Sequence, residues 1–168
     1  MKGNQILPTR ESAGTPPQPP TSPPRRILVV DDEECLRELS TQVLIHSGYN
    51  VDAAEDGAVA WNTLQHNSYD LLITDNNMPN VTGVELLQKL HAARMDLPVI
   101  MVSGTIPTAE LSRHSWLQID ATLLKPFTPD ELLTTVRKVL YAIDTAPEQL
   151  APLPGSRSQA PVDASWVL

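Results

Sequence analysis

The stretch YDLLITDNNMPN, residues 69–80, decides the fold. Its DLLIT run (70–74) is apolar without alternation, which predicts a strand that is buried on both faces. The strand then stops on a carboxylate, Asp75, which two amides, Met78 and Pro79 follow. A plain turn is made more simply with Asn-Gly or Pro-Gly. Because open α/β sheets keep their chemistry at the carboxyl ends of their strands, we interpret Asp75 as a functional acid.

Strand and helix patterns alternate on both sides of this stretch. The predicted strands cover 26–30, 50–55, 70–74, 98–103 and 121–124. The predicted helices cover 33–48, 56–67, 82–94, 107–117 and 128–143. Apolar strands that alternate with helices are typical of an α/β fold, a doubly wound five-stranded parallel sheet with helices on both faces.

Apolar residues at helical spacing predict which side of each helix faces the sheet. The expected buried positions are Leu36, Leu39, Val43, Leu44, Val59, Ala60, Leu64, Val84, Leu87 and Leu90. In the last helix, Thr128 is the expected N-cap and Pro129 the first helical residue.

The 168 residues are enough for one domain with flanking segments. Seven of the 16 prolines fall within the first 24 residues, so we expect 1–25 to be an extended or disordered segment. We expect the domain to cover 26–144, and 145–168 to be a tail rich in Pro, Ala and Ser.

A net charge of −8 argues against nucleic acid or an anionic membrane as a direct partner. A single cysteine, Cys35, excludes a disulfide framework and a thiolate zinc site. The sequence shows neither a signal peptide nor an apolar run of roughly 18 residues, so we expect a cytoplasmic protein without membrane insertion.

Several predicted strands deliver polar residues to the same edge of the sheet. They are Asp31 and Asp32, then Asp75, then Ser103 with Gly104 and Thr105, and finally Lys125 with Pro126, besides Glu55 and Asp56 after the second strand. Alone, each of these is commonly an N-cap, a turn residue or a solvated side chain. Together they predict one site, because the carboxyl ends of parallel strands meet.

Clustered carboxylates repel one another unless a cation joins them. Oxygen ligands without nearby His or Cys suit Mg²⁺, which readily shares a site with a phosphoryl group. A carboxylate can itself accept a phosphoryl group, whose charge then needs a metal, a cation and hydrogen-bond donors. We therefore interpret Asp75 as the phosphoacceptor, with Lys125 and the Ser103 hydroxyl as its stabilising groups.

The motifs ILVVDDEE, LLITDNNMPNVTGVELL, VIMVSG and LLKPF, in this order and spacing, resemble the receiver domain of bacterial response regulators. The resemblance covers roughly 26–144. It implies a flavodoxin-like fold with strand order 2-1-3-4-5. It also implies two-component (phosphorelay) signal transduction by a phosphoprotein rather than a true enzyme.

The resemblance assigns a role to individual positions. It implies that Asp75 accepts the phosphoryl group and that Ser103 and Lys125 stabilise it. The implied Mg²⁺ ligands are Asp31, Asp32, Asp75 and the backbone carbonyl of Asn77. It further implies a cis peptide bond at Pro126 and a loop containing Pro79 and Gly83.

Three features depart from the family pattern, one of which is that WLQID (116–120), before the last strand, lacks the usual Gly-Ala. Thr122 stands where the family usually carries Tyr or Phe, and Gly104 follows the hydroxyl residue where Ala is common. We expect the switch region to comprise Thr105 and Thr122. We expect phosphorylation to alter 103–108 more than the strand 121–124. The segment 109–116 is then either the partner-facing surface or an ordinary solvated helix face covered by Trp116.

The leading hypothesis is a stand-alone receiver without an output domain of its own, which signals through protein contacts. Its expected partners are a histidine kinase or a histidine phosphotransfer protein, and an unidentified effector. One alternative is a degenerate receiver that serves as a phosphate-independent binding scaffold. Another is an aspartyl-phosphate phosphatase of the haloacid-dehalogenase type, which needs an acid where this chain has Asn77.

Overall fold

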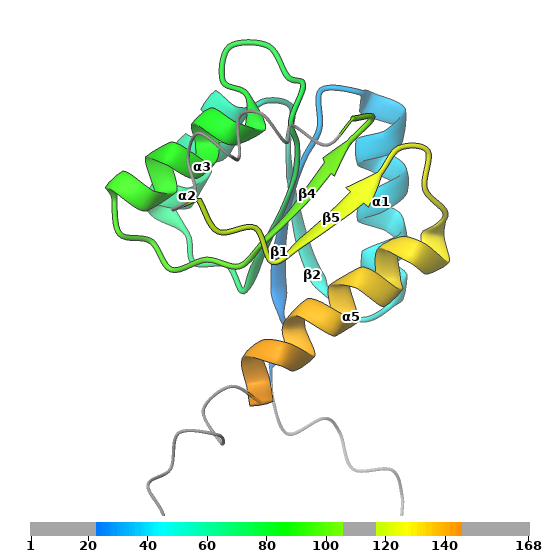
Figure 1. The fold of residues 1–168 in the computed structure, drawn as a ribbon. Coiled ribbons are helices and arrows are strands. Elements are labelled where there is room, and N and C mark those ends of the chain that lie inside the picture. Colours follow the sequence, from blue (N-terminus) through cyan, green and yellow to red (C-terminus); the bar gives the residue numbers. More distant parts are fainter. Residues whose placement is uncertain (1–22, 106–116, 146–168) are drawn as a thin grey trace, which may run out of the picture.

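The computed structural model describes residues 23–105 and 117–145 (Figure 1). Its elements are β1 (Arg26–Val30), α1 (Glu34–His46), β2 (Asn50–Ala54), α2 (Gly57–His66), β3 (Leu71–Asp75), α3 (Gly83–Ala92), β4 (Val99–Ser103), β5 (Ala121–Leu124) and α5 (Pro129–Thr145). In these two ranges, no helix has the length and apolar character needed to cross a membrane.

The five strands form one parallel sheet in the order β2-β1-β3-β4-β5. Helices α1 and α5 cover one face of this sheet, and α2 and α3 cover the other (Figure 1). The predicted fold class and strand order are confirmed. The helix predicted over 107–117 and the surface 109–116 fall almost wholly outside the described residues.

The three central strands of the sheet, β1, β3 and β4, are buried on both faces because their sequences are largely apolar at successive positions. In β1, Leu28 and Val30 pack with α2 and α3, whereas Ile27 and Val29 pack with α1 and α5. All residues of β3 and β4 are buried, including the polar ends of both strands. Side chains alternate between the two faces of a strand, so one continuous apolar run supplies two cores.

Capping boxes stabilise the starts of α3 and α5. Thr82 and Glu85 form a capping box at α3, each bonding the backbone N–H of the other. Thr128 and Glu131 exchange the same pair of bonds at the start of α5, where Pro129 is the first helical residue. The predicted N-cap of the last helix is thus confirmed.

Two predicted core positions are wrong. Leu39 is 49% exposed and Val59 is 41% exposed, while their chain neighbours Ser40 and Ala60 are buried. One residue along a helix turns the side chain by about 100°, so each apolar side chain lies just outside the buried stripe. For these two helices, the spacing of apolar residues therefore misplaced the buried face by about one residue, because packing on the sheet decides which side chains are covered.

A polar cluster ties the amino-terminal ends of β1 and β3 to β2. Asp52 accepts hydrogen bonds from Tyr69 Oη at 2.7 Å and from Arg26 Nε at 2.9 Å. The Arg26 guanidinium also lies 4.7 Å from the centroid of the Tyr69 ring. The hydrogen bond from Tyr69, supported by Arg26, lowers the pKa of Asp52. Burial and the bond to Asp52 raise the pKa of Tyr69 to about 12.

This cluster predicts a pH-dependent contribution to stability. Tyr69→Phe should lower the free energy of unfolding by about 1 kcal/mol at pH 8, because a partly exposed bond to a carboxylate is lost. The folded pKa of about 12 lies above the unfolded value of 10.0, so the contribution is full below pH 10 and disappears as pH rises toward 12. Urea unfolding of both proteins at pH 8 and pH 11 tests this; a difference that grows at pH 11 would contradict it.

Candidate acidic site

The carboxyl ends of β1 and β3 place two carboxylates side by side. The register pairs Val30 with Thr74, so Asp31 and Asp75 are the next residues on adjacent strands. Both aspartates are 5% exposed, whereas Asp32 is exposed. The site therefore combines two buried acids with one that faces solvent.

Lys125 joins the two buried acids. It directly follows β5, and its Nζ lies 2.9 Å from Asp31 Oδ2 and 2.6 Å from Asp75 Oδ2. Since β4 separates β5 from β3, the long side chain reaches across the end of β4 to make these bonds. The peptide bond between Lys125 and Pro126 is cis.

Burial and ion pairing oppose each other in this group. Burial raises the pKa of Asp31, and the hydrogen bonds from Lys125 and the Glu33 amide only partly offset that rise. Burial alone would lower the pKa of Lys125, but its bonds to Asp31 and Asp75 raise it overall. One ammonium thus serves two carboxylates, and the cluster keeps an excess of negative charge.

Asn76 fixes the backbone immediately after Asp75. Its N–H donates to the Val102 carbonyl at 3.1 Å, and its own carbonyl accepts from Gly83 N at 3.1 Å. Its side-chain oxygen accepts from Val84 N at 3.2 Å. Sequence reasoning assigned no role to Asn76, and the one hint was the unusual run of amides after the acid.

The backbone N–H of the next residue, Asn77, points back toward the Asp75 carboxylate. Asn77 N donates to Asp75 Oδ1 at 3.2 Å, so each oxygen of this carboxylate has a hydrogen-bond donor. Asn77 itself is exposed beside the acidic cluster.

Gly83 lets the start of α3 approach the end of β3. A Cβ at this position would lie 2.4 Å from the Asp75 carbonyl oxygen and 2.9 Å from the Asn76 Cα. Both atoms are backbone, so neither can swing away. The glycine expected in this loop is required by its contact with the backbone at the end of β3.

The remaining predicted site residues, Ser103, Thr105 and Thr122, come from β4, the loop after it and β5. Ser103 is buried, and its hydroxyl donates to the Thr105 carbonyl at 2.6 Å. Thr105 N in turn donates to Ser103 Oγ at 3.3 Å. Thr122 is exposed on β5, between two residues that pack toward α5. The structure brings together Asp31, Asp32, Asp75 and Lys125, while the Ser103 hydroxyl bonds within its own loop.

The donor set fits a hard divalent cation. Asp31, Asp32 and Asp75 each offer a carboxylate oxygen, and these oxygens lie within 4.8 Å of one another. All three are oxygen ligands, as Mg²⁺ prefers, and the exposed Asp32 leaves one side open to water.

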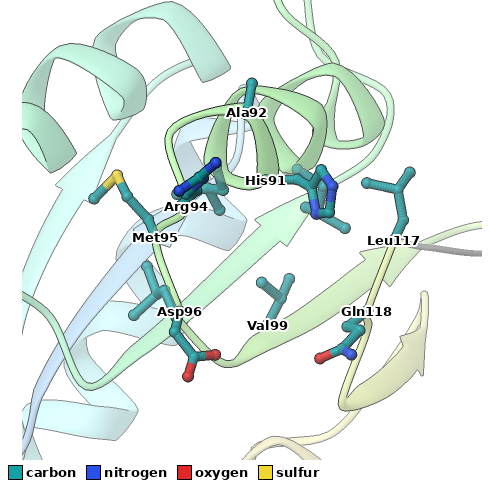
Figure 2. A pocket seen from close by; sticks show the side chains of 11 residues that line it. His91, Ala92, Arg94, Met95, Asp96, Val99, Leu117 and Gln118 are labelled. Atoms are coloured by element: carbon teal, nitrogen blue, oxygen red, sulfur yellow. The ribbon is translucent and has the colours of Figure 1, made fainter.

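A separate hollow of about 600 Å³ lies beside the end of α3 (Figure 2). His91, Arg94 and Asp96 contribute its polar walls, and Val99 lies at its base. Val99 begins β4, whereas the Asp75 partner Val102 lies near the end of that strand. The hollow is therefore distinct from the acidic site.

The family model of the response regulator receiver domain matches residues 27–137. The chain belongs to this family. Among curated receivers, Rre1 of Synechocystis is 40% identical over 117 residues, which cover 68% of this chain and 51% of that protein. MprA of a Mycobacterium strain is 33% identical over 124 residues, covering 74% and 53% respectively. The chain spans about half the length of these relatives.

Solved receiver structures share the fold. Chemotaxis response regulator CheY4 of Vibrio cholerae is 29% identical with a TM-score of 0.63, covering 69% of this chain and 98% of that one. TrrA of Thermotoga maritima, solved with Mg²⁺ and beryllofluoride, is 35% identical with a TM-score of 0.61, covering 68% and 98%. Receiver domains are signalling modules that bind Mg²⁺ at an acidic pocket and interact with histidine kinases and effectors.

The close approach at Gly83 makes a stability prediction. Gly83→Ala should lower the free energy of unfolding by about 3 kcal/mol, because the new methyl group must displace backbone at the end of β3. The matched control is Gly104→Ala, where a Cβ meets nothing within 4 Å, and its change should stay within about 0.5 kcal/mol. Urea unfolding measures both; equal losses in the two variants would contradict the assigned contact.

Proposed function

We propose that this receiver accepts a phosphoryl group on Asp75 from a histidine kinase or a histidine phosphotransfer protein. The observation that carries the proposal is the buried Asp75 carboxylate, held 2.6 Å from the Lys125 ammonium within the three-acid cluster. A nucleophilic carboxylate needs a neighbouring cation to meet an incoming phosphate, and this one has it.

The transfer is a displacement at phosphorus. An Asp75 oxygen forms the new P–O bond while the P–N bond of the donor phosphohistidine breaks, and the leaving imidazole nitrogen keeps the bonding electrons and takes a proton from water. Lys125 stays beside the carboxylate and offsets the charge that the phosphoryl oxygens bring. The exposed side of the cluster at Asp32 is the route by which the donor approaches.

The Mg²⁺ ligands are Asp31, Asp32, Asp75 and the backbone carbonyl of Asn77. When bound, Mg²⁺ supplies the positive charge that the acidic cluster lacks and orients the phosphoryl oxygens. Within the acidic pair, Asp32 would bind the ion more directly than Asp31, because Asp32 is exposed whereas both oxygens of Asp31 already accept bonds from Lys125 and the Glu33 amide.

Ser103 supplies the hydroxyl that responds to phosphorylation. Its present bond to the Thr105 carbonyl uses the same proton that a phosphoryl oxygen would accept. Turning the hydroxyl toward the phosphoryl group releases Thr105, so the change spreads into the loop after β4. Thr122 is β-branched and exposed, so it lacks the bulk to fill a space behind that loop.

The protein then signals through contacts with an effector. A phosphate-independent scaffold is the competing function, and the labelling experiment below distinguishes the two. Asn77 occupies the position where a haloacid-dehalogenase phosphatase needs its second acid, so hydrolysis as the main activity is disfavoured.

Labelling tests the acceptor. With Mg²⁺ and acetyl phosphate, the wild-type protein should gain one acid-stable, base-labile phosphoryl group on Asp75, and Asp75→Asn should lose at least about 99% of the labelling rate. Intact-mass and peptide mass spectrometry locate the group. The control Asp70→Asn removes an acid just before the other end of β3 and should label normally. Label on Ser103, or full labelling of Asp75→Asn, would refute the assignment.

The metal ligands can be ranked. Asp32→Ala should weaken Mg²⁺ binding more than Asp31→Ala, and EDTA should stop phosphorylation, because the unscreened acids repel the donor. Isothermal titration calorimetry with MgCl₂ measures the affinities. Glu34→Ala, an acid in the first turn of α1 outside the cluster, should bind Mg²⁺ within about threefold of wild type. Labelling that persists in EDTA would overturn this role of the cluster.

A further inference from the structure

The loop between β3 and α3 contains a tight turn at Asn80. Asn80 has a φ of +63°, and across it Val81 N donates to the Pro79 carbonyl at 2.7 Å. A three-residue turn with positive φ is a rare and strained form, even though Asn tolerates positive φ better than most residues. Such strain persists only when neighbouring groups hold it in place.

Asp56 is the group that holds Asn80. Asn80 Nδ2 donates to Asp56 Oδ2 at 2.6 Å, across 24 residues of sequence. The other oxygen, Asp56 Oδ1, accepts from Val59 N at 2.8 Å and so caps α2. Asp56 is 8% exposed, and the bonds from Val59 and Asn80 lower its pKa, so it bonds as a carboxylate. One side chain therefore connects the start of α2 to the loop that follows the phosphoacceptor.

A backbone contact supports the same junction. A Cβ on Gly57 would lie 2.4 Å from the Val81 carbonyl oxygen, so the turn after β2 presses directly against the loop. On its other side the loop is anchored by Met78, which is 7% exposed in the core. Asn77 lies between the bonded Asp75 and the buried Met78, so its backbone is fixed on both sides.

We infer that Asp56 and Asn80 form a positioning pair for the metal site. Their hydrogen bond fixes the backbone of the 77–81 segment, which carries the proposed carbonyl ligand of Asn77, and it thereby sets the affinity for Mg²⁺ without either residue contacting the ion. The inference rests on the proposed function, in which Asn77 is a ligand. Groups that orient metal ligands from outside the ligand shell commonly change affinity by about 10–100-fold when removed.

The simpler role for Asp56 is that of an N-cap for α2 alone. The two roles separate because a serine keeps the cap but is too short to reach Asn80. At the other end of the bond, Asn80→Gly removes the amide and keeps a residue that adopts positive φ without strain. The variants are therefore Asp56→Ser, Asn80→Gly and their combination.

The test is isothermal titration of the full chain with MgCl₂, without a phosphoryl donor. Each single variant should bind Mg²⁺ about tenfold more weakly than wild type, and the double variant should be no weaker than the singles, since one bond is lost in every case. Tyr69→Phe, which loses a carboxylate bond at the opposite end of the sheet, should retain wild-type affinity and controls for general destabilisation. Amide hydrogen exchange of Val81 in metal-free protein should be faster in both single variants.

Three results would overturn the inference. If Asp56→Ser binds Mg²⁺ with wild-type affinity, Asp56 serves only as the N-cap of α2. Additive losses in the double variant would show that Asn80→Gly acts by loosening the loop and not through Asp56. Faster exchange with unchanged affinity would show that the pair holds the loop for stability alone. Failure of the proposed function looks different, because wild type itself would then show no Mg²⁺ binding or no label on Asp75.

Discussion

The bridge from the Lys125 ammonium to the two buried carboxylates is the interaction on which the site depends. Asp75 ends β3, and Asp31 directly follows the adjacent strand β1. Both side chains are almost fully buried, so water screens the repulsion between them poorly. The ammonium, 2.9 Å and 2.6 Å from their oxygens, offsets that repulsion and makes the paired ends of β1 and β3 compatible with burial. It also ties the end of β5 to the ends of β1 and β3, since Lys125 directly follows the last residue of β5.

The parallel sheet makes this bridge possible. Because all five strands run the same way, residues that are distant in sequence arrive at one edge. Lys125 crosses the end of β4, where Ser103 is a small residue whose hydroxyl bonds within its own loop. A long charged side chain at Ser103 would compete for this space. The small residue at the end of β4, between the acidic end of β3 and the basic end of β5, is therefore a packing requirement as well as a chemical one.

The sequence alone was enough to predict the strands of the sheet and the polar residues at the carboxyl ends of those strands. The runs in β1, β3 and β4 are apolar at successive positions, and only strands covered on both faces tolerate that pattern. Leu39 and Val59 were misplaced because apolar spacing alone leaves the rotation of a helix uncertain by about one residue. Asp56 and Asn80 are 24 residues apart, and no local pattern indicates that an N-cap carboxylate also bonds a distant loop.

The bonding of Asp75 shows how modification of this residue would reach the rest of the domain. Its two oxygens are bound separately, one by Lys125 from the end of β5 and one by the Asn77 amide from the following loop. Under the proposed function, the carboxylate oxygen that bonds to phosphorus loses most of its charge and becomes a weaker hydrogen-bond acceptor. Whichever oxygen reacts, one of these two bonds must be replaced. Either the β5 end or the β3–α3 loop therefore responds to the chemistry directly, and this coupling does not require an aromatic residue at the position of Thr122.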